Sequence, residues 1–323
     1  MSRLLTISEV CNFLRTRDNF TLLAHAFPDG DTIGASYALG YALKQLNKKV
    51  NIKCSDIVPQ KFQFISGAFK HDNTGDETII ALDVADTKLL GTLANEYADK
   101  IELSIDHHVS NREFSENLLL ESEASATCEI VYEILVELGV NFERQILDAL
   151  YTGIITDTGC FKFSNTTAKT HIIAADLIKR GVDYAEINRI MFDTKSRARV
   201  KIEGTVMDKI EYYFGGRVSF LTLTRQMIDE SGCDESELDG INALSRTIEG
   251  VVAGITARER KDGKFKISLR TNEPVDASGI CAKFGGGGHV RAAGCEFDCT
   301  LEEVKEKILP VVKLALEEKG CLI

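Results

Sequence analysis

The sequence predicts an α/β fold, in which a mostly parallel sheet carries helices on both faces and a smaller α/β domain follows. Segments typical of strands alternate with segments typical of helices through residues 1–190, as they do in βαβ units. After residue 206 the pattern changes to strands with fewer helices between them. The chain has 323 residues, and a single core stops growing at roughly 250–300 residues, so two domains are expected.

The first expected domain, residues 1–192, begins with four short apolar runs that read as buried strands. These strands are expected at 20–26, 50–55, 78–84 and 101–106, with helices at 31–48 and 87–100 between them. The pattern then turns helical, with helices expected at 126–138, 143–156, 167–180 and 183–192. Gly139 and Gly181 stand where C-terminal helix caps are expected.

A polar, basic run marks the expected linker, residues 193–206, and the second domain is expected at 207–323. In that domain the pattern predicts strands at 217–224, 251–259 and 264–271, with a helix at 239–248. The chain ends in an amphipathic helix expected at 301–319, which contains Pro310, a residue that kinks helices.

Composition excludes several classes of protein. The net charge of −11 argues against a grip on long duplex nucleic acid, which basic surfaces provide. No apolar run approaches the roughly 20 residues of a membrane span, and the N-terminus lacks the features of a secretory signal, so a cytoplasmic protein without membrane contact is expected. The nine cysteines show no C-x-x-C spacing and are expected to be reduced. A zinc site formed by Cys281, Cys295, Cys299 and His289 remains an alternative.

Acids and histidines gather where apolar runs of the first domain end. They are His25-Ala-Phe-Pro-Asp29-Gly-Asp31, then Asp83 with Asp86 nearby, then Asp106-His107-His108, and finally Asp157 after a helical run. Ligands of open parallel sheets bind beyond the carboxyl ends of the strands, so one crevice is expected to collect these side chains. Imidazole nitrogen beside several carboxylate oxygens is the ligand mixture that suits Mn²⁺ or a similar divalent ion.

Each of these residues also has an ordinary structural explanation. Asp31 stands at the start of a helix, where an acid caps and complements the dipole. Asp83 is compatible with a turn, Asp106 with a cap, and the two histidines that follow it with a packed core. The recurrence at four places in one domain favours metal binding over four separate coincidences. Seven ligands suit two ions, and two ions roughly 3.5–4 Å apart are typical of enzymes that cleave phosphate esters.

A glycine-rich segment is the second strong signal. Gly285, Gly286, Gly287 and Gly288 precede His289, and successive backbone N–H groups of such a run can cradle an anion. A helix beginning in 290–293 would add positive potential, whereas a flexible turn is the ordinary alternative. Arg270, at the end of an expected strand, is either a phosphate clamp or a surface arginine.

Together these motifs resemble the DHH/DHHA1 phosphoesterases, a family named for its Asp-His-His triplet. The resemblance covers nearly the whole chain and includes His25-x-x-x-Asp29-x-Asp31, Asp83, Asp106-His107-His108, Asp157 and Gly285-Gly-Gly-Gly-His289. The compact two-domain form is similar to the bacterial oligoribonucleases, or nano-RNases, that also dephosphorylate 3′-phosphoadenosine 5′-phosphate, pAp. The membrane-bound cyclic-di-AMP phosphodiesterases of the family carry segments that this sequence lacks.

The resemblance implies two Mn²⁺ ions, with Mg²⁺ or Co²⁺ as alternatives. One ion would be held by His25, Asp29 and Asp83, and the other by Asp31, Asp83, His107 and Asp157. Asp83 would bridge the ions, and His108 would face the scissile phosphate. The catalytic residues implied are His108, Asp83 and Asp106. The terminal nucleotide would be held, from across a cleft between the domains, by Arg270, Gly285, Gly286, Gly287, Gly288 and His289.

The implied activity is hydrolysis of very short single-stranded RNA to 5′-mononucleotides, together with removal of phosphate from pAp. A soluble phosphodiesterase for dinucleotides such as pApA, pGpG or cyclic-di-AMP is the nearest alternative. A manganese pyrophosphatase shares the first-domain pattern but not the glycine-rich segment, and a nucleotide-binding regulator would not need every ligand to be present. The resemblance also leaves room for a homodimer.

Overall fold

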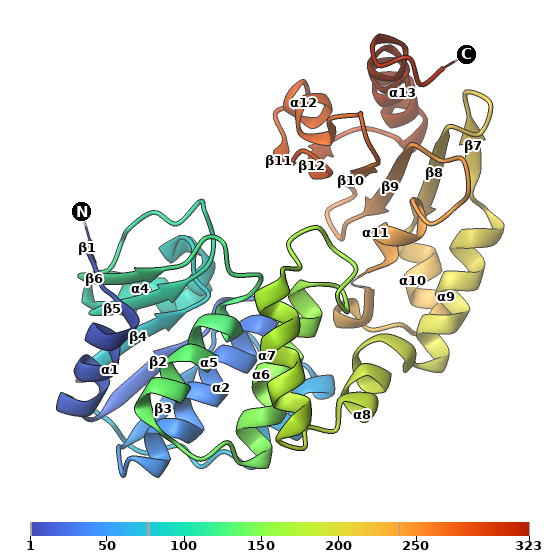
Figure 1. The fold of residues 1–323 in the computed structure, drawn as a ribbon. Helices are drawn as coiled ribbons and strands as arrows, with labels where there is room; N and C mark the ends of the chain where they lie inside the picture. The colour runs from blue at the N-terminus through green and yellow to red at the C-terminus, as the bar shows by residue number, and fades with distance from the viewer. Residues whose placement is uncertain (1, 76–77, 239, 323) are drawn as a thin grey trace. The chain divides into compact units, whose positions relative to one another are not determined.

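Two six-stranded sheets organise the chain, one in each of the two units into which its internal contacts divide it (Figure 1). The computed structural model describes residues 2–75, 78–238 and 240–322. The first unit spans Met1–Thr194 and the second spans Lys195–Ile323. Each unit has its own hydrophobic core.

The first sheet has the strand order β1-β6-β5-β4-β2-β3, and every neighbouring pair is parallel. Its strands are β1 Arg3–Leu4, β2 Phe20–Leu23, β3 Val50–Lys53, β4 Thr78–Leu82, β5 Leu103–Asp106 and β6 Asn117–Leu120. The α/β prediction is confirmed, and the four expected strands are present in shorter form. β1 and β6 were not predicted, because a two-residue strand and a short leucine run carry no periodic signal.

Helices cover both faces of this sheet because alternate strand residues point to opposite sides. On one face, Ile80 and Leu82 of β4 belong to a core that includes residues of α1 Ile7–Thr16, α2 Gly30–Gln45 and α5 Thr127–Leu138. On the other face, Ile79 and Ala81 pack with the segment that follows β4. That segment is not the single helix predicted at 87–100: it consists of the 3₁₀ helix η2 Thr87–Leu93, a short α4 Ala94–Tyr97 and the 3₁₀ turn η3 Ala98–Lys100.

The remaining helices of the first unit include those predicted at 31–48, 126–138, 143–156, 167–180 and 183–192, together with three that were not predicted, at 7–16, 60–62 and 63–66. They are α1 Ile7–Thr16, α2 Gly30–Gln45, η1 Gln60–Phe62, α3 Gln63–Ser66, α5 Thr127–Leu138, α6 Arg144–Asp157, α7 Ala168–Lys179, α8 Tyr184–Asn188 and the π-helical turn η4 Arg189–Asp193. Gly139 caps α5 in the left-handed conformation, with φ of 72°. Helix α1 was not predicted, although Thr6 and Glu9 form a capping box at its start.

The second sheet is mixed, with the order β11-β12-β10-β9-β8-β7, and only β8 and β9 pair in parallel. Its strands are β7 Glu211–Tyr213, β8 Val218–Leu223, β9 Ala253–Glu259, β10 Phe265–Thr271, β11 Gly287–His289 and β12 Ala292–Phe297. One face packs against α13 Leu301–Glu318, which continues through Pro310, and α12 Ala277–Ala282. The other face packs against α9 Arg197–Asp208, α10 Arg225–Ser231 and α11 Ile241–Leu244.

Three expectations for the second half of the chain were wrong in detail. The range expected as a linker is mostly α9, which is capped by Ser196 and buries Ile202 and Val206. The helix expected at 239–248 is only α11, preceded by the turn η5 Glu235–Leu238, and Asp239 lies outside the described residues. No helix begins in 290–293, because the chain turns there between the paired strands β11 and β12.

Within the described ranges, no helix combines the length and the apolar character needed to cross a membrane.

Candidate active site

The carboxyl ends of three adjacent strands carry the first group of predicted site residues. His25 lies two residues beyond β2, Asp83 directly follows β4, and Asp106 is the last residue of β5. The order β5-β4-β2 makes these strands neighbours, so all three ends lie at one edge of the parallel sheet. The acids and imidazoles therefore meet at the edge of the sheet where the sequence predicts them.

Two helices bring the remaining acids to the same place. Asp29 caps α2, where its Oδ1 accepts hydrogen bonds from the backbone of Asp31 and Thr32 at 3.1 Å each. Asp157 is the last residue of α6. The approach of α6 to α2 depends on Gly153, since a Cβ there would lie 2.7 Å from Asp31 Oδ1 and 2.2 Å from Cys128 Sγ.

We call the resulting group the carboxylate–imidazole cluster, and it consists of His25, Asp29, Asp31, Asp83, His107, His108 and Asp157. Its ligand atoms form three groups, each with all atoms within 4.8 Å of one another: Asp83, His107 and His108; His25, Asp29 and Asp83; and Asp31, His107 and Asp157. Seven of the residues that the sequence singled out thus converge. Asp86 lies outside these groups and instead caps η2.

Asp83 stands between two imidazoles. Its Oδ2 lies 3.5 Å from Nε2 of His25, and its Oδ1 lies 3.7 Å from Nε2 of His107. On the far sides, His25 Nε2 is 3.6 Å from Asp29 and His107 Nε2 is 3.3 Å from Asp157. The two oxygens of one buried carboxylate therefore face two separate groups of possible metal ligands.

Both imidazoles are oriented by the main chain. Nδ1 of His25 lies 2.7 Å from the carbonyl oxygen of Ala26, and Nδ1 of His107 lies 3.1 Å from that of Ala124. A carbonyl oxygen only accepts hydrogen bonds, so each Nδ1 carries the proton, and Nε2 of the neutral ring offers its lone pair to the cluster. Nε2 of His107 is buried and makes no hydrogen bond within the described residues. This orphaned nitrogen fits a metal ligand.

The surrounding carboxylates strongly favour positive charge on the two imidazoles. Burial opposes that charge, but Asp29 and Asp83 outweigh it and raise the pKa of His25 to about 11. Likewise, burial lowers the pKa of His107, but Asp157 and the neighbouring carboxylates raise it to about 10. Without another cation, protons would occupy the positions from which these nitrogens could bind a metal.

The acids show the complementary shift. Burial, with repulsion from Asp83 and Asp157, raises the pKa of Asp31 well above its usual range. Burial also raises the pKa of Asp157 to about 6, against the opposing pull of His107. Acids this crowded repel one another, and divalent cations would remove that repulsion. Together with the nitrogen and oxygen donor set, this supports the fit to two cations.

Asp106 has a different environment from the other acids. Its Oδ1 lies 2.7 Å from Nδ1 of His108, and its Oδ2 accepts a hydrogen bond from Asn111 at 2.7 Å. Burial opposes its charge, but these two contacts hold the pKa of Asp106 below its usual value. Asp106 belongs to none of the three groups, so it orients His108, whose side chain is 41% exposed, rather than contributing a ligand.

The start of α5 belongs to the site, although no sequence pattern was interpreted that way. The Oγ1 of Thr127 donates to Asp83 Oδ1 at 2.9 Å, and the backbone N–H groups of Thr127 and Cys128 donate to the two oxygens of Asp31 at 2.6 and 2.9 Å. A helix N-terminus therefore supports both acids. The small polar residues just before the helical run at 126–138 are the signal that could have located it.

In the second unit, the sheet register places two of the predicted substrate-binding residues in one row. Arg270 of β10 pairs with Ala292 of β12, which pairs with His289 of β11. Residues directly paired across strands share a face, so the side chains of Arg270 and His289 lie on the same side of the sheet. Burial and the nearby Arg246 lower the pKa of Arg270, an environment that an anion would relieve.

The glycine-rich segment is tightly built rather than loose. A Cβ on Gly286 would lie 2.1 Å from the carbonyl oxygen of Gly294, and Gly288 adopts φ of 141° beside Ala293. Gly285 is also left-handed, with φ of 73°. Side chains at Gly286 and Gly288 would force the β11–β12 hairpin apart, whereas Gly285 has open space and is constrained only by its φ. The alternative of a zinc site gains no support, because the metal-binding groups found in the described residues contain no cysteine.

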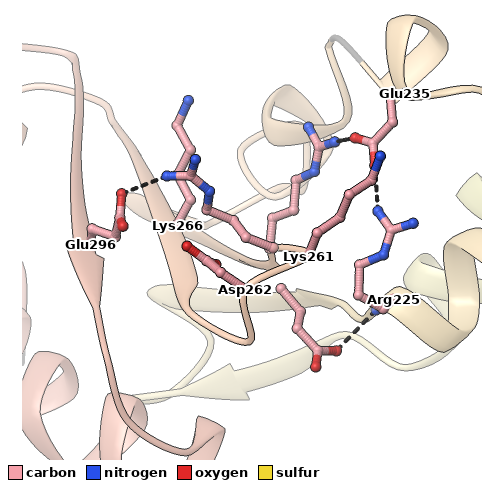
Figure 2. Close-up of a pocket in the computed structure, with 9 residues that line it drawn as sticks. Arg225, Glu235, Lys261, Asp262, Lys266 and Glu296 are labelled. Atoms are coloured by element: carbon pink, nitrogen blue, oxygen red, sulfur yellow. Dashed lines mark hydrogen bonds and ion pairs between the residues drawn. The ribbon is translucent and has the colours of Figure 1, made fainter.

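A pocket of about 600 Å³ also lies in the second unit, at the hairpin between β9 and β10 (Figure 2). Its arginines are largely paired: Arg225 and Arg258 with Glu235, and Arg260 with Glu296. None of the predicted site residues lines it. It is an ion-pair network at the surface, and we assign the chemistry to the carboxylate–imidazole cluster instead.

Comparison with known proteins gives the class of the chain. The model of the DHH family, N-terminal domain, matches residues 19–154, and that of the DHHA1 domain matches residues 216–318. The bifunctional oligoribonuclease and PAP phosphatase NrnA of Thermus thermophilus is 32% identical over 309 residues, which cover 93% of this chain and 91% of the relative. The chain belongs to the DHH/DHHA1 phosphoesterase family.

Solved structures agree with this assignment. An exopolyphosphatase-related protein from Bacteroides fragilis is 25% identical, with a TM-score of 0.85. The alignment covers 97% of this chain and 95% of that protein. The fold is also similar to that of RecJ from Thermus thermophilus, solved in complex with Mn²⁺, at 12% identity and a TM-score of 0.55 over 97% of this chain and 55% of the other.

Proposed function

We propose that the carboxylate–imidazole cluster holds two divalent cations, Mn²⁺ by preference, and hydrolyses phosphodiesters of very short RNA. The first ion would be bound by His25, Asp29 and Asp83, and the second by Asp31, Asp83, His107 and Asp157. The observation that carries the proposal is the position of Asp83, whose two oxygens face the Nε2 atoms of His25 and His107. The manganese complex of the structural relative RecJ supports the choice of metal.

When bound, such a pair of ions supplies Lewis acidity, which neutralises phosphoryl oxygens and lowers the pKa of water to about 7. The chain itself orients the participants. His108 is the exposed imidazole of the cluster, and its hydrogen bond to Asp106 holds the ring at the edge where a scissile phosphate would lie. Protonated His108 would donate to that phosphate, since Asp106 raises the pKa of His108.

We further propose that the products are 5′-mononucleotides and that pAp is a second substrate. The name of the Thermus thermophilus relative, an oligoribonuclease and PAP phosphatase, supports both activities. The net charge of −11 favours substrates with few phosphates, because a long polyanion would be repelled. Arg270, the glycine-rich hairpin and His289 would hold the terminal nucleotide, with the guanidinium and the backbone N–H groups donating hydrogen bonds to its phosphate.

A substrate-profile assay with Mn²⁺ tests the proposal. Short oligoribonucleotides, pAp, pGpG and pyrophosphate are compared, with the Asp83→Ala variant as the control for contaminating nucleases. Turnover of the short RNA and of pAp is expected. Turnover of pyrophosphate alone would favour an inorganic pyrophosphatase, and turnover of none would favour a nucleotide-binding module.

A further inference from the structure

Phe27 presents an aromatic ring to solvent inside the segment that carries two predicted metal ligands. Its exposed fraction is 87%, among the highest of the large apolar residues described. His25 stands two residues before it and Asp29 two residues after it. Two residues of chain span at most about 7 Å, so the Cα of Phe27 lies within that distance of the Cα of each ligand.

The backbone holds this ring outward at a conformational cost. Phe27 has φ of 54°, a left-handed conformation that bulky residues rarely adopt. Its N–H donates to Oδ2 of Asp56 at 2.9 Å, and the N–H of Ala26 donates to the carbonyl oxygen of Leu89 at 2.6 Å. Two neighbouring loops thus fix the segment. Strain of this kind persists where the surrounding structure enforces it, and it is concentrated at functional sites.

A second apolar side chain extends this surface. Ile57 adjoins Asp56 in the loop after β3 and is 93% exposed. β2 and β3 are neighbours in the sheet, and the hydrogen bond between Phe27 and Asp56 joins the two loops that follow them. Apolar surface therefore lies at the same edge of the sheet as the carboxylate–imidazole cluster.

We propose that the Phe27 ring is the stacking platform for a nucleobase of the substrate, the base next to the phosphate held by the cluster. This inference rests on the proposed function, since an oligonucleotide brings a flat base close to every phosphate. Stacking on an aromatic ring is tolerant of sequence and strengthens binding roughly 5- to 150-fold per base. Base-free phosphates such as pyrophosphate would gain nothing from this ring.

Fluorescence provides a test that does not depend on turnover. The chain contains no tryptophan, so Phe27→Trp introduces a single reporter at this position. Ile172→Trp is the matched control, because Ile172 lies on α7 of the same unit and is 69% exposed. Each variant is titrated with adenosine 5′-monophosphate and with ribose 5-phosphate, which lacks the base.

Adenosine 5′-monophosphate is expected to quench the indole of the Phe27→Trp variant and to leave that of the Ile172→Trp variant unchanged, while ribose 5-phosphate quenches neither. Absence of quenching in Phe27→Trp, or equal quenching in both variants, overturns the inference. This readout needs no hydrolysis, so it tests Phe27 even if the chain turns over none of the proposed substrates. Absence of turnover would refute the proposed function, whereas absence of quenching would refute the role of Phe27.

Kinetics supply the second test. Phe27→Ala is expected to raise the KM for a dinucleotide about tenfold with little change in kcat. Phe27→Tyr, which keeps an aromatic ring, is expected to have the KM of the wild type. Phe27→Asn should raise the melting temperature, because Asn tolerates positive φ, and yet raise KM like Ala. An unchanged KM in Phe27→Ala, or an equal rise for an abasic dinucleotide, contradicts stacking.

Discussion

Removal of one hydroxyl group at the start of α5 gives a sharp test of how the site is supported. Thr127 is fully buried, and its Oγ1 donates to Asp83 Oδ1 at 2.9 Å. Thr127→Val keeps nearly the same shape but deletes this donor. The backbone N–H of residue 127 still donates to Asp31, so the helix start is retained.

The expected magnitude follows from the hydrogen bond to a charged acceptor. Such bonds contribute about 1.5–3 kcal/mol, which corresponds to about 10- to 150-fold in an equilibrium constant. Loss of a supporting contact to a metal ligand typically weakens metal affinity by about 10- to 100-fold. We therefore expect the Mn²⁺ dissociation constant of Thr127→Val to rise by about 10- to 100-fold.

Isothermal titration of metal-free protein with Mn²⁺ measures this change directly. Thr127→Ser is the control, because it keeps the hydroxyl and should bind Mn²⁺ within about threefold of the wild type. Melting temperatures establish that both variants are folded. If Thr127→Val binds Mn²⁺ as tightly as the wild type, the hydroxyl does not orient Asp83, and our account of the bridging carboxylate is wrong.

Four further predictions follow from the same site and its scaffold. Asp83→Ala should abolish turnover, since it detaches both ions, and near-normal rates in a steady-state assay would rule out a bridging role. Mn²⁺ at about 100 times its dissociation constant should raise the melting temperature by roughly 5–10 °C in the wild type but little in Asp83→Ala, as scanning calorimetry can measure. Gly153→Ala should weaken Mn²⁺ binding in titration, because the new methyl group would lie 2.7 Å from Asp31 Oδ1; unchanged affinity would show that α2 and α6 adjust freely. The contacts of Asp72 to Lys44 and to the N–H of Val50 lower the pKa of its carboxyl group in the folded state. These contacts therefore stabilise the folded state fully above the unfolded-state pKa of about 3.9. The stabilisation is lost as pH falls through the lower folded-state pKa. Asp72→Asn should accordingly destabilise by about 1 kcal/mol at neutral pH, reduced by solvent screening, with the difference vanishing at low pH in denaturant titrations.

The sequence could predict that these acids and histidines lie close together because each stands beside an element with a clear local pattern. Each acid or histidine followed a recognisable strand or helix, and the carboxyl ends of parallel strands share one edge. The elements that were missed lacked such a signal. β1 has only two residues. The polar run at the start of α9 gives no sign that Ile202 and Val206 are buried, because they pack against a sheet formed by residues later in the chain.

The sequence by itself determined which acids and histidines are candidate metal ligands and where the helices and strands that present them end, to within a few residues. Only the tertiary structure decided how those donors face one another. The two oxygens of Asp83 point to different imidazoles, and Thr127 reaches Asp31 across 96 residues of sequence. Such contacts depend on strand order and on the close approach of α2 and α6 at Gly153. Both arise from packing between segments far apart in the sequence, so no local sequence pattern predicts them.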